Sequence, residues 1–306
     1  MKVISHSADA DGRLSAFLVA KYYNLTNPQD FIMMDYGDGN TTWLSQINQD
    51  EDVVICDFGF EKKSEDMLKL LQITKNIIWI DHHESTINDY GEMEKDIAGV
   101  RVNGTAACML TYIYFYIIGE RYPNIVGKRI ELSQEECEKF YQYAPLLVRL
   151  VHDNDVWRYQ YGNATSQFKL GLDSENIISP IDNKWNKLFE DESEVYKLVG
   201  VGEHLVKYRD SLGSFACDHY GFEIELCGKK GFALNNCMGG SPWFVDRIKE
   251  YDFVCSFVYI GNGKWEYSFY SDKTDRVSCF DIAKSLNPNG GGHKGAAGCT
   301  LDKFIF

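Results

Sequence analysis

Short apolar runs that stop abruptly at acidic or imidazole side chains mark the first half of this chain. Ile77–Ile80 ends at Asp81-His82-His83, and Val53–Cys56 ends at Asp57. Runs of four or five such residues are typical of strands buried on both faces. A carboxylate left unpaired at the end of a buried strand costs several kcal/mol. The pattern therefore predicts that these side chains gather around a partner of opposite charge.

Helical periodicity alternates with these apolar runs. Arg13–Tyr23 carries apolar residues at helical spacing directly after the first short strand, Lys2–Ser5. Strands separated by helices indicate a parallel sheet with helices on its faces, which is the α/β class. Further segments of the same region are expected as strands at Asp30–Met34, Val53–Cys56 and Ile77–Ile80, and as a helix at Ser64–Leu71.

The middle of the chain is expected to be helical and then irregular. Thr105–Ile118 is apolar almost all round, which predicts a buried helix. Ser133 followed by Glu136 forms a capping box that opens a helix running toward Leu150. That helix is expected to deliver Asp153 and Asp155 at its end. From Gly162 to Asp191 the pattern predicts no regular element.

The C-terminal part is expected to form a smaller α+β domain. Glu194–Phe215 regains helical periodicity, and we interpret it as a linker between domains. The predicted boundaries are 1–190 for a catalytic domain, 191–216 for the linker and 217–306 for the second domain. The second domain is expected to hold strands at Phe222–Leu226, Gly231–Leu234, Phe253–Tyr259 and Trp265–Tyr270, helices at Trp243–Glu250 and Phe280–Ser285, and a glycine-rich loop at its end.

Composition narrows the class of protein. A chain of 306 residues is long enough for two domains. Its formal net charge of -14 disfavours binding to long nucleic acids. Nine cysteines without CxxC pairing suggest reduced thiols in a cytoplasm. No apolar run approaches the length that spans a bilayer, so neither a membrane segment nor a membrane partner is expected. Exposed aromatic residues would suit a dimer interface, so the sequence is compatible with a homodimer.

The first polar loop and Asp57 are candidate metal ligands. His6, Asp9 and Asp11 follow the first strand at spacings that let them face one cavity. Carboxylates that close repel each other unless cations hold them, although an acidic loop can also be merely solvated. Asp57 is best interpreted as a bridging ligand between two cations, and the alternative is a cap for the helix that follows.

The adjacent histidines divide the remaining work. Because neighbours in sequence cannot easily approach one ion from the same side, we expect one of the two imidazoles to ligate and the other to face a substrate phosphate. Asp81 either orients a ring or ligates directly. Mixed carboxylate and imidazole ligands suit Mn²⁺, with Mg²⁺ possible and Zn²⁺ less suited. Two such ions activate water for phosphoester hydrolysis.

The terminal glycine-rich segment, Asn289–Gly298, predicts an anion clamp. Gly290, Gly291 and Gly292 leave the backbone N–H groups open, and His293 and Lys294 add an imidazole and an ammonium. The alternative is a flexible turn.

These motifs together resemble the DHH phosphoesterases with their associated C-terminal domain. Asp81-His82-His83 is similar to the name-giving motif, Asp9-Ala-Asp11-Gly12 to the first motif and Cys56-Asp57 to the second. The segment from Val151 to Asp153 resembles the fourth, with Asp153 preferred over Asp155 because it directly follows an apolar run. Gly290–Gly298 resembles the signature of the associated domain. The match covers nearly the whole chain in the expected order.

The resemblance implies two metal ions on the N-terminal domain and substrate recognition on the C-terminal one. By analogy, His6, Asp9 and Asp57 hold one ion, and the other is held by Asp11, Asp57, His82 and Asp153. His83 contacts the scissile phosphate, and Tyr270 takes over a substrate contact where relatives often carry arginine. We therefore expect a Mn²⁺-dependent phosphodiesterase acting on short single-stranded oligonucleotides or linear dinucleotides. The alternatives are a pAp phosphatase, an exopolyphosphatase-like enzyme and a catalytically silent nucleotide binder.

Overall fold

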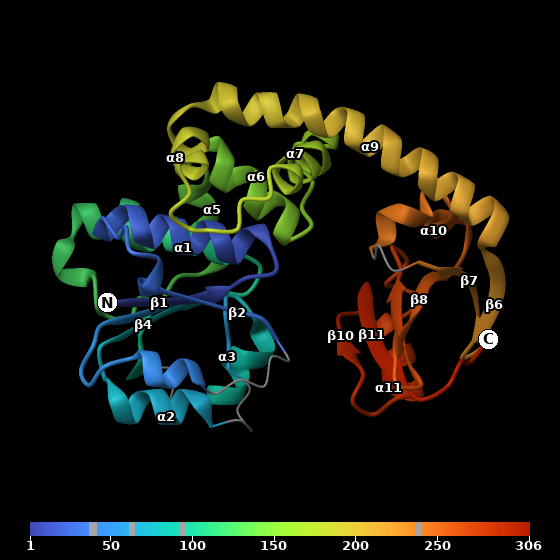
Figure 1. Cartoon of the computed structure of the whole chain (residues 1–306), viewed down its shortest axis with the longest axis horizontal. Helices are drawn as coiled ribbons and strands as arrows, with labels where there is room; N and C mark the ends of the chain where they lie inside the picture. Colours follow the sequence, from blue (N-terminus) through green and yellow to red (C-terminus); the bar gives the residue numbers. More distant parts are fainter. Residues whose placement is uncertain (37–41, 61–64, 92–95, 237–239) are drawn as a thin grey trace. The chain divides into compact units, whose positions relative to one another are not determined.

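The computed structural model describes residues 1–36, 42–60, 65–91, 96–236 and 240–306 (Figure 1). The chain divides into two compact units, Met1–Glu203 and His204–Phe306. The border lies inside α9 (Glu192–Tyr220), a helix that corresponds to the predicted linker but continues past its C-terminal end. Each unit contains its own sheet, as expected for an α/β domain followed by a smaller α+β domain.

The first unit is built on a five-stranded parallel sheet in the order β2-β1-β3-β4-β5. The parallel sheet predicted from the sequence is thus confirmed, while β5 was not foreseen. In this order the chain moves to opposite sides of β1 to form β2 and β3, so the carboxyl ends of β1 and β3 flank a crevice where α/β proteins place ligands. The strands are β1 (Lys2–His6), β2 (Phe31–Met34), β3 (Val53–Cys56), β4 (Ile77–Asp81) and β5 (Ala98–Arg101).

Helices cover both faces of this sheet (Figure 1). Alternate strand residues point to opposite faces, so Val54 and Cys56 join the core under α1 (Ala10–Tyr23) and α4 (Ala107–Tyr112). Val53 and Ile55 face the other layer, with α2 (Asp66–Ile73) and α3 (Glu84–Tyr90). Burial on both faces explains why the strands are apolar throughout. Ser64, the expected start of α2, lies outside the described residues.

The predicted extent of one helix in this region was wrong. The helix opened by the capping box of Ser133 and Glu136 is α5 (Gln134–Tyr141), which stops well before Leu150. A second helix, α6 (Leu146–Asp155), begins after Pro145, whose ring and missing N–H prevent a helix from continuing through it. The predicted buried helix begins as α4 and continues as a π-helix, Ile113–Gly119.

The segment expected to be irregular forms two helices, α7 (Asn163–Ser174) and α8 (Asn183–Glu190). Phe168 and Leu172 are buried on α7, and Trp185 and Leu188 on α8, which is the spacing of one helical face. Glycine and asparagine in this stretch concealed that spacing. Short 3-10 helices elsewhere span Pro28–Asp30, Thr42–Gln46, Pro123–Ile125 and Ser241–Phe244.

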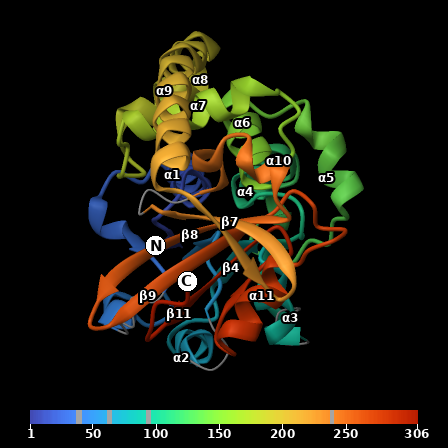
Figure 2. The ribbon, with the colours of Figure 1, turned by 90° about the vertical axis from the view of Figure 1, so that its right-hand side faces the viewer.

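The second unit contains a six-stranded mixed sheet in the order β10-β11-β9-β8-β7-β6, in which only β7 and β8 pair in parallel. Helix α11 (Cys279–Leu286) packs against β11 and β9 (Figure 2). The predicted Trp243–Glu250 helix is reduced to α10 (Arg247–Glu250) after a 3-10 turn. The strands are β6 (Phe222–Leu226), β7 (Lys229–Asn235), β8 (Phe253–Gly261), β9 (Lys264–Tyr270), β10 (Gly291–Gly292) and β11 (Ala296–Leu301).

Two sequence expectations bear on the environment of the protein. In the described parts of the chain, no helix combines the length and the hydropathy needed to cross a bilayer. The eight cysteines that the structure describes are all free thiols.

The buried face of α8 provides a test of the helices that the sequence pattern hid. Trp185 is 1% exposed and stacks on Phe17 of α1 at a ring distance of 6.1 Å. Trp185→Ala is expected to lower the free energy of unfolding of the first unit by about 3–5 kcal/mol, because it leaves a large cavity. Tyr196→Ala on the exposed side of α9 is the control and should stay within about 0.5 kcal/mol. Calorimetric melting measures the loss of unfolding free energy in both variants. Equal losses would contradict the packing of Trp185 on Phe17.

Candidate metal centre

Three adjacent strands of the first sheet bring the candidate ligands together. His6 ends β1, Asp57 directly follows β3, and Asp81 ends β4 with His82 and His83 after it. Because β1, β3 and β4 are parallel neighbours, their carboxyl ends meet at one edge of the sheet. The sequence expectation that these residues converge agrees with the structure.

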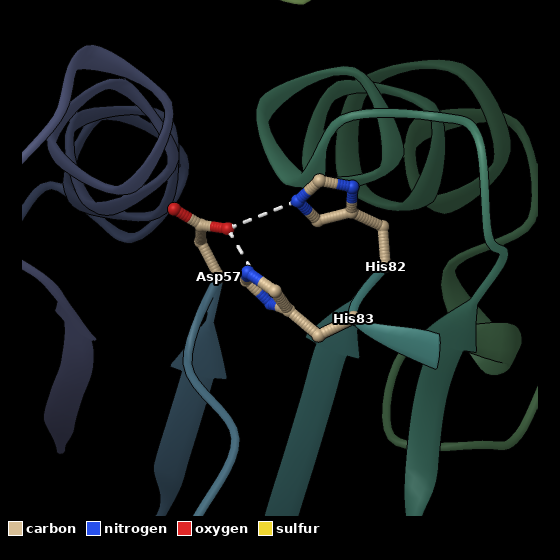
Figure 3. A group of neighbouring side chains, drawn as sticks. All are labelled: Asp57, His82 and His83. Atoms are coloured by element: carbon tan, nitrogen blue, oxygen red, sulfur yellow. Dashed lines mark ion pairs between the residues drawn. The ribbon is translucent and has the colours of Figure 1, made fainter. Parts of the chain in front are cut away.

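Asp57 occupies the centre of the cluster (Figure 3). Its Oδ1 lies 3.3 Å from His82 Nε2 and 4.0 Å from His83 Nδ1, whereas its Oδ2 lies 3.8 Å from His6 Nδ1. The side chain is 2% exposed. Its φ of +52° places the backbone in the left-handed region, which a residue other than glycine enters at a cost. The alternative role as a helix cap is wrong, because Glu65 occupies the cap position of α2.

Among the residues that the structure describes, three groups of side chains have ligand atoms within 4.8 Å of one another and could each hold a cation. Asp57 belongs to two of them, so its carboxylate connects the groups, as a bridging ligand does. The groups are His6, Asp9 and Asp57; Asp57, His82 and His83; and Asp11, His82 and Asp155.

The loop after β1 holds its two carboxylates rigidly. Asp9 caps α1 by accepting a hydrogen bond from Gly12 N–H at 3.0 Å, and its other oxygen lies 3.0 Å from His6 Nδ1. Asp11 accepts hydrogen bonds from Ala107 N–H and Cys108 N–H, at 2.8 and 2.7 Å, at the start of α4. A side chain on Gly12 would collide with the carbonyl of His6, 2.2 Å from the Cβ position, so glycine lets α1 approach β1.

The electrostatics of the cluster are unfavourable without added positive charge. Burial, followed by the charge of Asp11, raises the pKa values of Asp57 and Asp155 well above their ordinary range. Burial lowers the pKa of His6, but Asp57 and Asp9 outweigh it and raise that pKa to about 11. Burial also raises the pKa of Asp9, but His6 outweighs it and lowers that pKa to about 2. The folded chain therefore holds more negative charge here than it can solvate.

Unpaired oxygen atoms show that the residues fit divalent cations. Asp57 Oδ2 and Asp155 Oδ2 are buried and accept no hydrogen bond from any residue that the structure describes. Buried carboxylate oxygens without donors are costly unless a cation binds them. Carboxylate and imidazole donors are the ligands that Mn²⁺ and Mg²⁺ share with other divalent ions.

The structure places Asp155, rather than Asp153, in the cluster. Asp155 Oδ2 lies 3.5 Å from His82 Nε2. Asp153 is fully buried elsewhere, where it accepts hydrogen bonds from Thr165 Oγ1 and from Gln160 N–H. Two residues apart on a helix are about 200° apart in direction, so only one of them can face the site. The choice of Asp153 from its apolar neighbours ignored this rotation.

Asp81 orients His83. Asp81 Oδ1 accepts hydrogen bonds from His83 Nδ1 at 2.7 Å and from His82 N–H at 2.8 Å. With Nδ1 donating to Asp81, His83 presents Nε2, and the side chain is 33% exposed. Burial lowers the pKa of His83, but the hydrogen bond and charge of Asp81 outweigh it and raise the pKa above its ordinary value.

Two further residues at this edge escaped the sequence analysis. Asp35, which follows β2, lies 3.3 Å from His6 Nε2 through its Oδ1. The rule that found Asp57 would have found it, because β2 is the next strand beside β1 and its acid also follows the strand end. Tyr36 is half-exposed, its ring centroid lies 5.2 Å from His6 and 6.0 Å from His83, and it stacks on Phe58. A single tyrosine carries no such signal in sequence.

The predicted substrate-binding residues lie in the second unit. Gly290–Lys294 contributes to the β10–β11 hairpin, whose turn closes with a hydrogen bond from His293 N–H to Ala296 C=O at 2.6 Å. His293 and Lys294 are exposed. Gly292 has a φ of +128°, which requires glycine. Tyr270 lies two strands from β10, opposite Ala296 on β11, and its hydroxyl accepts a hydrogen bond from Gly240 N–H. Their role in binding stays a prediction.

Comparison with known proteins supports the fold. No protein-family model matches the sequence, and no curated protein does. Among solved structures, the chain is similar to a DHH domain described as a member of the S1p family of ribosomal proteins, with 16% identity, a TM-score of 0.57, and 98% of this chain and 83% of that one covered. It is also similar to the pGpG-specific phosphodiesterase PggH of Vibrio cholerae, with 12% identity, a TM-score of 0.50, and 98% and 93% covered. The chain thus shares the fold of these proteins over almost its whole length.

The charge of Asp57 can be tested by removing it without changing its shape. Asparagine tolerates the left-handed backbone, so Asp57→Asn should keep the fold. In chelator, the variant is expected to melt about 2–4 °C above the original protein, because one buried charge is gone. Saturating Mn²⁺ should raise the melting temperature of the original protein but not that of the variant. Equal stabilisation of both by Mn²⁺, measured by calorimetry, would refute the central role of Asp57.

The two acids of α6 should behave oppositely. Asp155→Asn is expected to weaken Mn²⁺ binding at least tenfold, because a ligand oxygen is lost. Asp153→Asn should leave the Mn²⁺ affinity unchanged and cost roughly 1–3 kcal/mol of stability, because it disturbs the hydrogen bonds to Thr165 and Gln160. Isothermal titration with Mn²⁺ and thermal melting distinguish them. If Asp153→Asn weakens Mn²⁺ binding and Asp155→Asn does not, Asp153 is the ligand.

Proposed function

We propose that this protein is a DHH-type, metal-dependent phosphohydrolase. The observation that carries the proposal is the buried carboxylate of Asp57, which faces His6 through one oxygen and His82 and His83 through the other. Such a carboxylate connects two cation positions, and paired divalent cations are typical of enzymes that cleave phosphoesters. The shared fold with a DHH domain and with a phosphodiesterase supports this interpretation.

The residues present would hold two cations. Asp57 would hold one cation with His6 and Asp9. Its other oxygen lies 3.3 Å from His82, which groups with Asp11 and Asp155, so Asp57 would also contribute to the second cation. When bound, Mn²⁺ or Mg²⁺ supplies positive charge that polarises a phosphoryl oxygen and a water molecule. The preponderance of carboxylates over imidazoles favours Mn²⁺ over Zn²⁺ in this proposal.

His83 is the group of the chain that meets the substrate. Asp81 holds its Nδ1–H, so Nε2 is the atom available to a phosphate. Because the pKa of His83 lies above its ordinary value, the ring is suited to donating a hydrogen bond or a proton to an oxygen that gains negative charge. Asp81 acts through His83 by fixing its orientation. Replacing Asp81 would disturb the position of the ring first.

Short substrates fit the charge of the chain. Long nucleic acids need an extended positive surface, which a net charge of -14 opposes. The exposed backbone and cations of the β10–β11 hairpin suit one or a few phosphates. We therefore propose a phosphodiesterase for short oligonucleotides or linear dinucleotides, and the name of the Vibrio protein specifies such a dinucleotide as its substrate. The alternatives are a pAp phosphatase, an exopolyphosphatase-like enzyme and a silent nucleotide binder.

A substrate panel tests the proposal. With Mn²⁺, the protein is expected to hydrolyse a labelled dinucleotide faster than pAp or polyphosphate, as resolved by chromatography of the products. Faster release of phosphate from pAp or from polyphosphate would select the corresponding alternative. Binding of nucleotide without any turnover would select the silent binder.

Two histidine variants separate chemistry from binding in the same assay. His83→Gln is expected to lower kcat by about 10²–10⁴-fold with little change in KM, which is the contribution typical of a catalytic acid or base. His293→Ala should mainly raise KM, roughly tenfold, because a charge-assisted contact to phosphate is lost. If kcat falls for His293→Ala and not for His83→Gln, then His293 takes part in the chemistry and His83 does not.

A further inference from the structure

A cavity of about 90 Å³ opens beside the metal centre, between the start of α1, the end of α6 and α7. Three of the candidate ligands form one wall, namely Asp9, Asp11 and Asp155. The opposite wall is apolar, with Leu150, Phe168 and Leu172. Two cations, Arg13 and Lys169, complete the lining. The cavity is therefore continuous with the cluster, yet the proposed chemistry does not use it.

Arg13 is the cation in this cavity that forms no ion pair with an acid among the described residues, although its charge lowers the pKa of Asp9. Its Nε donates a hydrogen bond to the backbone carbonyl of Asp9 at 2.8 Å, which anchors the side chain. The two terminal nitrogens form no hydrogen bond or ion pair with any residue in the described parts of the chain. By contrast, Lys169 pairs with Asp173 at 2.5 Å. A partly buried guanidinium with both terminal nitrogens available is suited to a planar or tetrahedral oxyanion.

The charges around the cavity favour an anion once cations fill the centre. Divalent ions would neutralise Asp9, Asp11 and Asp155, and Lys169 pairs with Asp173. The remaining charge is then the single positive charge of Arg13. The apolar wall excludes water, which strengthens the attraction between that charge and an anion. A cavity of this size admits a group no larger than one phosphate.

We propose that this cavity binds a second, non-scissile phosphate of the substrate through Arg13. The inference rests on the proposed function and narrows it to substrates that carry a phosphomonoester in addition to the bond that is cleaved. Dinucleotides with a terminal phosphate and nucleoside bisphosphates belong to this class, whereas unphosphorylated dinucleosides do not. Arg13 is a specificity residue, because it contacts a part of the substrate that does not react.

Binding of matched dinucleotides tests the inference. Dissociation constants for ApA, pApA and ApAp are measured by calorimetry with Mn²⁺ in the His83→Gln protein, so that turnover does not interfere. One of the two phosphorylated compounds is expected to bind about 10- to 100-fold more tightly than ApA. Arg13→Gln should reduce this preference to within about twofold while leaving the affinity for ApA unchanged. Arg13→Lys should retain part of the preference.

The controls separate this contact from general effects. A double variant, Lys169→Gln with Asp173→Asn, removes a neutral pair from the same cavity and should keep the full preference. The inference is overturned if the parent protein shows no preference, if Arg13→Gln keeps it, or if Arg13→Gln weakens all three compounds equally. Failure of the proposed function looks different: the protein would hydrolyse no phosphoester, while an Arg13-dependent preference in binding would still be measured.

Discussion

The mutual repulsion of buried carboxylates is the constraint on which the rest of the site depends. Asp57 and Asp11 are almost wholly withdrawn from water, and Asp155 joins them from another helix. The chain supplies part of the compensation itself, because the first N–H groups of α4 bond to Asp11 and the backbone after β4 bonds to Asp81. One oxygen of Asp57 and one of Asp155 receive no hydrogen bond from the described part of the chain, which shows where this compensation ends. The fold thus stores an unfavourable charge that divalent cations can relieve.

The order of the strands determines which acids can meet. Residues immediately after β1, β3 and β4 are far apart in sequence, but parallel pairing places them at one edge. Asp57 has a left-handed backbone, and its carboxylate faces the histidines that come from the neighbouring strands. Gly12 lets α1 lie close to β1, so that Asp9 and Asp11 approach the same edge. A cavity between helices then remains beside the centre, which makes room for Arg13.

Sequence was sufficient where one local rule decided the outcome. Apolar runs ending in acids identified β1, β3 and β4 with Asp57, Asp81 and His82, because burial and strand ends are local properties. Sequence was insufficient where the direction of a side chain or long-range packing decided the outcome. Asp153 and Asp155 differ only in which way α6 turns them, and α8 is stabilised by Trp185 packing on Phe17, far away in the sequence. Asp35 directly follows a predicted strand, so the strand-end rule covers it as well, and the sheet order adds only that this strand lies beside β1.

The net charge of the chain and the charge of the site need not agree in sign. A protein of charge -14 repels a polyanion once the two approach to within about a Debye length, about 8–10 Å, so long nucleic acids are disfavoured at close approach. Inside the site the balance is local: two divalent ions would offset the acids that line it, and Arg13 would then be in excess. An acidic surface around a centre that metal ions make positive favours small anions, because these fit completely inside the site. For the proposed function, substrate length would thereby be limited by electrostatics as well as by the size of the cavity.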